Sequence, residues 1–154
     1  DILETTMMFD PESNQWDNAL RSLVAVSNAI LDIEDEDWAK ARLCPMVDAR
    51  RMEVYAQVFN NEGVALSDVA AEVVETESFK KWREEGKLVI FGNGAAKCSE
   101  VLGDALLVNV APSARGIVRL AEEAFNNSKF EDLAYFEPFY LKDFIVIPSK
   151  KKLL

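Results

Sequence analysis

Two strand-forming segments, residues 42–47 and 52–59, restrict the fold more than any other feature of this sequence. Both are rich in Val, Met, Tyr and Phe, and four residues separate them: Asp48, Ala49, Arg50 and Arg51. In the second segment, apolar side chains fall on both alternating faces, which is typical of a strand that is covered on both sides. We therefore predict a β-hairpin in which Asp48 accepts backbone N–H bonds in the turn and one of the two arginines pairs with Glu53.

Downstream of the hairpin, strand and helix patterns alternate. A second turn is followed by a predicted strand at 66–75 and a helix at 76–85, which is capped near Thr76 and closed by Gly86. Further strands are predicted at 87–91 and 105–110, and a glycine turn and a helix connect them.

The last predicted helix begins at Pro112 and Ser113 and ends at Asn126 and Asn127. Its expected core face consists of Ile117, Leu120, Ala121, Ala124 and Phe125. A hairpin followed by alternating helices and strands predicts an α/β fold, in which a mixed β-sheet carries helices on its faces.

We expect one main domain with two short additions, because 154 residues can bury roughly two-thirds of the unfolded surface. Residues 1–41 are predicted to form an irregular N-terminal segment and a connecting helix at 17–33, residues 42–146 the main lobe, and residues 147–154 a basic tail. The acids after the helix oppose its dipole and therefore belong to a solvated connection. A calcium loop is the alternative for these acids, but they lack the spacing and the turn glycine of an EF-hand.

The charge balance argues against direct, strong binding of nucleic acid. The formal net charge is −10, so the phosphate backbone of a nucleic acid would be repelled. The basic cluster Lys150 to Lys152 can neutralise only a few phosphates. No run approaches the ~20 apolar residues of a membrane span, and no secretion signal opens the sequence, so we expect a cytoplasmic protein without a membrane segment.

The sequence contains no histidine, which is the usual general base near neutral pH and the commonest metal-ligating side chain. Histidine-based triads and most zinc chemistry are therefore excluded for this chain. Cys44 and Cys98 stand alone and far apart, as is typical of buried thiols in a reducing compartment. Cys98 near a helix start is a weak candidate nucleophile, since no orienting base accompanies it. We predict no enzymatic activity, no metal and no cofactor.

Gly92 and Gly94 lie between a predicted strand and a predicted helix, where backbone amides can cradle a phosphate. The complete G-x-G-x-x-G pattern and a Lys-Ser or Lys-Thr pair are missing, so a simple turn is favoured. Glu53 is the best placed general acid, although an ion pair with a neighbouring arginine is favoured.

Near the C-terminus, aromatic side chains gather around a proline that restricts the backbone: Tyr135, Phe136, Phe139 and Tyr140, with Phe144 shortly after. A cap over the core is one interpretation of this group. An exposed patch that binds a partner protein is the other, because aromatic side chains on a restricted backbone make good anchors.

Four segments, in this order, resemble the C-terminal half of bacterial TsaB, also called YeaZ. They read PMVDARRMEVY at 45–55, FGNGA at 91–95, PSARGIVRLA at 112–121 and EPFYLKDF at 137–144. Together they extend over about two-thirds of the chain. The matching residues are Asp48, Arg50, Glu53 and Tyr55 in the hairpin, Gly92 and Gly94 as the remnant of an adenosine loop, and Pro138, Tyr140 and Leu141 in the closing segment.

The resemblance implies an actin-like ATPase fold, with a lobe of the RNase H-like type. It also implies a non-catalytic partner that supports the catalytic subunit TsaD, together with the ATPase TsaE, in installing threonylcarbamoyl on adenosine 37 of tRNA. A glycoprotease-like peptidase and an ATP-dependent, chaperone-like module are the alternatives. Both follow from older interpretations of the same family.

One departure from the family affects the expected assembly. A full family member begins with a lobe of roughly a hundred residues, a typical domain length, for which only the helix at 17–33 is available here. We therefore expect no closed two-lobed nucleotide cleft. The inner face of that helix would be exposed, so a homodimer is the expected compensation.

Overall fold

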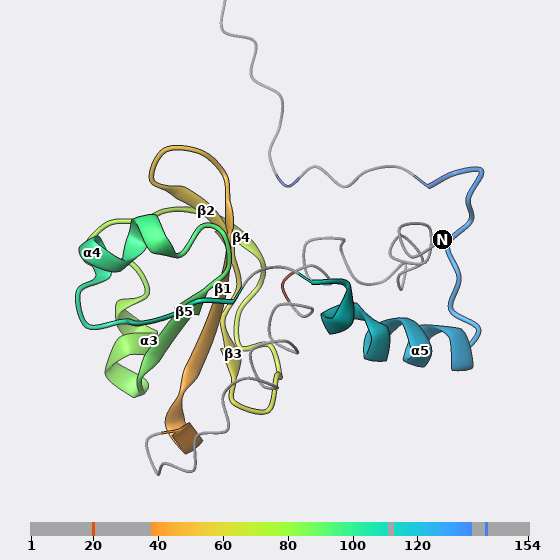
Figure 1. Ribbon diagram of the computed structural model, residues 1–154, viewed down its shortest axis with the longest axis horizontal. Coiled ribbons are helices and arrows are strands. Elements are labelled where there is room, and N and C mark those ends of the chain that lie inside the picture. Colours follow the sequence, from red (N-terminus) through yellow and green to blue (C-terminus); the bar gives the residue numbers. More distant parts are fainter. Residues whose placement is uncertain (1–19, 21–37, 111–112, 137–140, 142–154) are drawn as a thin grey trace, which may run out of the picture.

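A single mixed β-sheet organises the part of the chain that the structure, a computed structural model, describes (Figure 1). The described residues are 20, 38–110, 113–136 and 141. Apart from the buried, helical Leu20, the predicted helix at 17–33 lies outside them, as does the basic tail at 147–154, so the predicted domain boundaries stay predictions.

The sheet has six strands; turns and loops connect the first four, and short helices lead from β4 to β5 and from β5 to β6. The elements are η1 (Trp38–Lys40), β1 (Arg42–Asp48), β2 (Glu53–Ala56), β3 (Phe59–Asn60), β4 (Ala70–Val73), α3 (Lys80–Glu85), β5 (Leu88–Phe91), η2 (Ala96–Cys98), α4 (Ser99–Leu102), β6 (Leu106–Val108), η3 (Ala114–Ile117) and α5 (Val118–Asn126). The predicted hairpin, the strands near 87–91 and 105–110, and the last helix are confirmed.

Strand β1 is central in the sheet, whose order is β4-β2-β1-β5-β6. On one side of β1, β2 pairs antiparallel with β1, and β4 pairs antiparallel with β2. On the other side, β5 pairs parallel with β1, and β6 pairs parallel with β5. The hairpin turn explains the antiparallel side, while α3 and α4 are the crossovers that parallel strands require. The predicted mixed α/β fold is confirmed.

Strands β2 and β3 form one interrupted partner of β1. Met46 lies opposite Ala56 and Leu43 opposite Phe59, so the register is the same on both sides of the gap. The gap faces Pro45, which has no N–H group to donate to a ladder. Val58 uses its backbone groups elsewhere: its N–H donates to Ser67 Oγ at 3.0 Å, and its carbonyl accepts the Leu66 N–H at 2.7 Å.

Apolar side chains cover both faces of the sheet, as the sequence predicts. Along β5, Leu88 and Ile90 belong to one core cluster, and Val89 and Phe91 belong to the other. The first cluster is closed by α3 and α4, through side chains such as Trp82 and Leu102. Each fully buried Leu, Ile or Phe stabilises the fold by about 1.5–3 kcal/mol, so these two clusters are the main source of stability in the described chain.

Helix α3 begins later than predicted, at Lys80 instead of residue 76. The Ser78 N–H donates to the Glu75 carbonyl at 3.0 Å, and the Glu75 N–H donates to Ser78 Oγ at 3.1 Å. This turn uses the residues expected for the first helical turn, and Phe79 follows it with a left-handed φ of 58°. The prediction of a cap near Thr76 is therefore wrong, whereas the end at Gly86 is confirmed.

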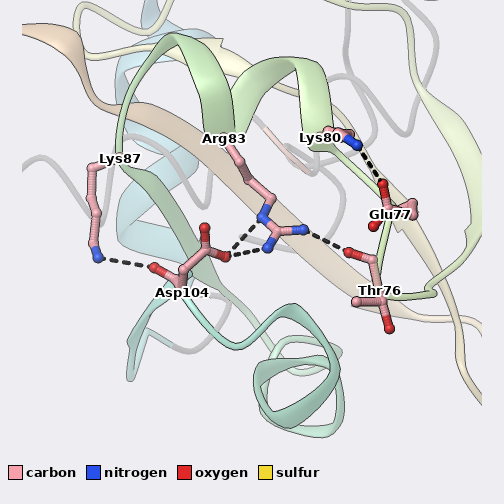
Figure 2. Close-up of polar contacts among 6 residues, drawn as sticks. All are labelled: Thr76, Glu77, Lys80, Arg83, Lys87 and Asp104. Carbon is pink, nitrogen blue, oxygen red and sulfur yellow. Dashed lines mark hydrogen bonds and ion pairs between the residues drawn. The ribbon is translucent and has the colours of Figure 1, made fainter.

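A polar network attaches α3 to the turn between α4 and β6 (Figure 2). Arg83 Nε donates to Asp104 Oδ1 at 2.8 Å, and Arg83 Nη1 donates to the Thr76 carbonyl at 2.7 Å. Lys87 Nζ donates to the Asp104 carbonyl at 2.9 Å. The arginine thus connects the turn before its own helix with a loop that follows the next helix.

The last helix forms where predicted, but its expected core face is not buried. No residue of α5 is buried; of the expected face, Ile117, Leu120, Ala121 and Ala124 are half-buried and Phe125 is 68% exposed. Figure 1 shows α5 to one side of the sheet, away from the face that α3 and α4 cover. The prediction that this face belongs to the core is therefore wrong for the described chain.

Candidate functional site

The hairpin turn between β1 and β2 is tight and contains two residues with positive φ. Arg50 and Arg51 have φ values of 71° and 48°. The left-handed conformation costs non-glycine residues about 1–2 kcal/mol each, so other contacts must hold the turn. Asp48 Oδ1 accepts the Arg50 N–H at 3.1 Å, as the sequence predicts, and the Ala49 N–H donates to the Glu53 carbonyl at 3.1 Å.

The turn between β5 and η2 lies directly against the end of β1. The Gly94 N–H donates to the Met46 carbonyl at 3.0 Å, and Asn93 Oδ1 accepts the Asp48 N–H at 3.1 Å. A Cβ atom at Gly94 would lie 3.0 Å from Asp48 N, from Val47 C and from Val54 Cγ1. Glycine is therefore required here for a close approach of two backbones.

Lys97 completes this contact by reaching from η2 to both sides of the hairpin. Its Nζ forms an ion pair with Asp48 Oδ1 and donates to the Glu53 carbonyl at 2.7 Å. The hydrogen bond from Lys97 is the main reason why the pKa of the Asp48 carboxyl lies below its usual value. We call this set the hairpin junction; it consists of Asp48, Arg50, Glu53, Asn93, Gly94 and Lys97.

The structure thus unites two motifs that the sequence presents separately, the charged hairpin and the glycine turn. The ion pair described at the hairpin joins Asp48 to Lys97, which the sequence analysis did not single out. The available signal was a lysine three residues after Gly94, one helical turn away from the glycine turn. The predicted pairing of Glu53 with an arginine stays a prediction.

The backbone amides of the glycine turn already donate to carbonyls within the chain. The Gly92 N–H donates to Val110, the Gly94 N–H to Met46 and the Ala95 N–H to Gly92, at 3.0 to 3.2 Å. Gly92 has a φ of 98°, which explains its glycine. In this conformation the three amides stabilise the fold, so a phosphate would have to compete with carbonyl acceptors. The adenosine loop suggested by the resemblance stays a prediction.

The two cysteines are buried and form no disulfide, and the pKa values of both thiols are raised. Burial is the main reason why the pKa of the Cys44 thiol is strongly raised, and the Cys98 thiol and the Glu72 charge add to it. Burial also raises the pKa of Cys98, against the smaller opposing effect of Lys97. A thiol with a raised pKa is a poor nucleophile at neutral pH. Among the described residues, no group of three or more His, Cys, Asp or Glu could hold a metal ion.

Two further predicted site residues that the structure describes, Tyr55 and Leu141, do not belong to the hairpin junction. Tyr55 lies in β2, between Val47 of β1 and Ala71 of β4. Pro138 and Tyr140 lie outside the described residues, while Leu141 is half-buried. Of the aromatic group, Tyr135 is 83% exposed and Phe136 is half-buried, and the others lie outside the described residues. Tyr135 therefore is not a cap over the core.

No protein-family model matches this sequence, and no curated protein matches it. Among solved structures, the fold is similar to a crystal structure described as "an uncharacterized protein with similarity to peptidase YEAZ from Pseudomonas aeruginosa". The TM-score is 0.50 and the sequence identity 19%, over 78% of this chain and 56% of that one. The chain therefore spans little more than half the length of this neighbour.

At this level of identity the likeness shows a shared fold. The chain has a YeaZ-like α/β fold, whose mixed sheet carries helices. In the described ranges, none of the helices has the length and apolar character that crossing a membrane requires.

Proposed function

We propose that this chain is an RNase H-like lobe of the actin-like ATPase type and that it works as a non-catalytic partner subunit in tRNA modification. In this role it supports TsaD, together with TsaE, in forming N6-threonylcarbamoyladenosine at position 37 of tRNA. The proposal adds an activity and partners to the YeaZ-like fold. It rests on the sequence resemblance and on the topology of the sheet.

The strand order is the observation that carries the proposal. Three strands, β1, β2 and β4, are antiparallel, and β5 and β6 then continue parallel on the other side of β1. A mixed sheet with helices on its faces is the architecture that the resemblance implies for an RNase H-like lobe. The likeness to a solved protein described as similar to YEAZ supports the same conclusion independently of the quoted motifs.

The geometry of the hairpin junction supports a structural role for the motif residues that the chain shares with the family. Asp48 and Gly94 join the hairpin to the glycine turn, with the help of Lys97, which lies outside the quoted motifs. A partner subunit of this kind would act by binding the competent conformation of TsaD better than other conformations, which shifts the population toward it.

Capture of TsaD and TsaE tests the proposed function. The chain is immobilised and incubated with purified TsaD and TsaE, beside a form extended at its N-terminus by the corresponding lobe. We expect TsaD to be retained, and retained more strongly by the extended form. Failure of both forms to retain TsaD, measured with folded material, would contradict the proposal.

Tyr135 provides a sharper test of the aromatic patch. Because this side chain is 83% exposed, Tyr135→Ala should leave the melting temperature unchanged and reduce TsaD retention severalfold. Glu123→Ala, at another exposed position, is the matched control and should retain TsaD like the parent chain. A lower melting temperature with unchanged retention would show that the patch is structural instead.

The peptidase named in the description of the solved neighbour gives the second candidate function. Hydrolysis of peptide substrates by the purified chain, abolished by a chelator and restored by a divalent metal, would favour it over the partner role. We expect no such hydrolysis, because the chain contains no histidine and its described thiols have raised pKa values.

A further inference from the structure

One face of η3 and α5 carries apolar side chains in a heptad pattern. Its members are separated by four, three and four residues, and they are Ala114, Val118, Ala121 and Phe125. All four line the hollow of about 760 Å³ beside α5, so the structure places them on one face. A mean spacing of about 3.5 residues is typical of a helix that packs lengthwise against another helix. We call these four residues the α5 seam.

The α5 seam is open to solvent over most of its length. Phe125 is 68% exposed and Val118 is 52% exposed, and Ala114 is exposed as well. Figure 1 shows α5 to one side of the sheet, away from the face that α3 and α4 cover. By contrast, Leu20 of the predicted helix at 17–33 is fully buried in a core cluster. At Leu20 the helix face is therefore already covered, whereas the α5 seam is accessible to a second molecule.

The α5 seam matches itself in size when two copies run antiparallel. If Val118 lies opposite Ala121 of the second copy, Phe125 falls opposite Ala114 of that copy. A two-fold axis repeats both contacts, so every layer joins a large side chain to a small one. Alternation of large and small side chains lets two helices interdigitate closely. In a parallel pair, Phe125 would face Phe125 and Ala114 would face Ala114, which fits poorly.

The charges beside the α5 seam match in the same register. Arg115 and Glu122 each follow an alanine of the seam, and both line the hollow. They are seven residues apart, about 10 Å along the helix axis, so they do not meet within one copy. The ion pairs found within the described residues include neither side chain. In the antiparallel pair, Arg115 of each copy lies beside Glu122 of the other.

The order of charges along the helix favours a neighbour more than the helix itself. Basic residues come first, Arg115 and Arg119, and acidic residues come last, Glu122 and Glu123. A helix dipole favours the reverse order, with acids near the N-terminus and bases near the C-terminus. An antiparallel neighbour places its acidic end beside the basic start of the first helix, so the unfavourable order becomes a favourable contact between copies.

We propose that the α5 seam is an interface between two copies of this chain, which pair antiparallel with Val118 against Ala121 and Arg115 beside Glu122 of the second copy. The interface is separate from the inner face of the helix at 17–33. It does not rest on the proposed role in tRNA modification. Because the contact extends over only four layers, we expect a dimer that dissociates on dilution, with a Kd on the order of 100 µM.

Sedimentation velocity of the full chain tests this proposal, at low salt and from about 10 µM to about 1 mM, which brackets the expected Kd. We expect monomer at the lowest concentration and dimer at the highest. Glu122→Arg places two arginines together and should weaken the dimer at least about tenfold. It also makes the net charge two units less negative, so an effect of net charge alone would strengthen association instead.

A charge exchange tests the register. Arg115→Glu should weaken the dimer like Glu122→Arg, and a double variant with both changes should return the Kd to within about threefold of the parent value, because the ion pair is restored with its direction reversed. Arg115 and Glu122 are exposed, so all three variants should fold. Melting curves at about 10 µM, where the chain is monomeric, check this.

Two further variants separate the α5 seam from the rest of the helix. Glu123→Arg is the same substitution one residue along, at an exposed position that does not line the hollow, and should leave the Kd unchanged. Val118→Lys places a charge within the seam itself and should abolish detectable dimer.

Four results would overturn the proposal. A parent chain that stays monomeric at about 1 mM would leave the α5 seam to a different protein or to solvent. Stronger association of Glu122→Arg would attribute the dimer to net charge, and equal weakening by Glu123→Arg would show that the seam is not the interface. Failure of the double variant to recover would exclude the antiparallel register. The chain is measured alone, so these results are independent of TsaD capture.

Discussion

The central sheet and helix α5 have similar apolar patterns but different surroundings. In β5, all four residues are buried, and successive side chains enter opposite core clusters. Along α5, the regular apolar face is only half-buried at Leu120, Ala121 and Ala124 and is exposed at Phe125, beside a hollow of about 760 Å³ that Ile117, Val118 and Phe125 help to line. Amphipathic periodicity thus specifies which residues share a face, while burial depends on a second surface to cover that face.

Replacing one phenylalanine in each region should reveal the largest difference. Phe91→Ala removes a fully buried ring, and we expect it to lower the free energy of unfolding by about 3–5 kcal/mol. Phe125→Ala removes an exposed ring whose described aromatic contact is Phe130, at 5.8 Å between centroids, and should cost about 1 kcal/mol or less. Urea unfolding, followed by circular dichroism, measures both changes. Equal losses would break the comparison, because they would mean that α5 is as well packed as the sheet.

Adding atoms should give a smaller difference in the same direction. At Gly86, a Cβ atom would lie 1.9 Å from the Lys40 carbonyl oxygen, so Gly86→Ala forces a backbone shift and should cost about 1–3 kcal/mol. Ala121 lines the hollow of α5, so Ala121→Leu should change the stability by less than about 0.5 kcal/mol. Thermal unfolding of the two variants provides the measurement. A stable Gly86→Ala variant would show that the chain between η1 and β5 is less tightly packed than described.

The smallest expected effect concerns the surface ion pair between Arg83 and Asp104. Its contribution to stability can be compared with the contribution of packing in the core. Arg83 lowers the pKa of the Asp104 carboxyl below its usual value of 3.8, mainly through its hydrogen bond. A lowered carboxyl pKa contributes stability that is complete above the usual value and is lost as the pH falls through the lower, folded value. Asp104 is largely exposed, so Asp104→Asn should cost less than about 1 kcal/mol at pH 7.

The same reasoning fixes the pH dependence of that variant. The difference in stability between Asp104→Asn and the parent chain should shrink as the pH falls below 3.8, and it should shrink at high salt. Glu62→Gln, an exposed change without a described ion pair, serves as the control. A difference that stays constant from pH 7 to pH 3 would show that the loss comes from packing around Asp104 instead of its charge.

Much of the sheet could be predicted from the sequence, because local patterns specify strands and turns. The segments around 42–59, 88–91 and 106–108 combine apolar, β-branched residues with clear turn signals, and all became strands. The start of α3 could not be predicted in this way. Ser78 offered an alternative hydrogen bond to the backbone, and a turn replaced the first helical turn.

The candidate site shows the same division more clearly. Asp48 and Gly94 were recognisable as a turn acid and a turn glycine, but their contact depends on two strands that are adjacent in space and distant in sequence. Lys97 was missed for that reason, since its partners lie more than forty residues away. In the same way, no sequence pattern indicated that Gln57 Oε1 would be buried without a hydrogen-bond donor among the described residues.

By itself, the sequence determined the types of element, the apolar faces and the absence of histidine chemistry in this chain, because these depend on residue identity and short-range spacing. The tertiary structure alone decided which faces are covered, which charges meet and, among the described residues, where a buried acceptor is left without a donor. These outcomes depend on contacts between distant segments, and their energies arise from desolvation and close packing, which no local pattern encodes.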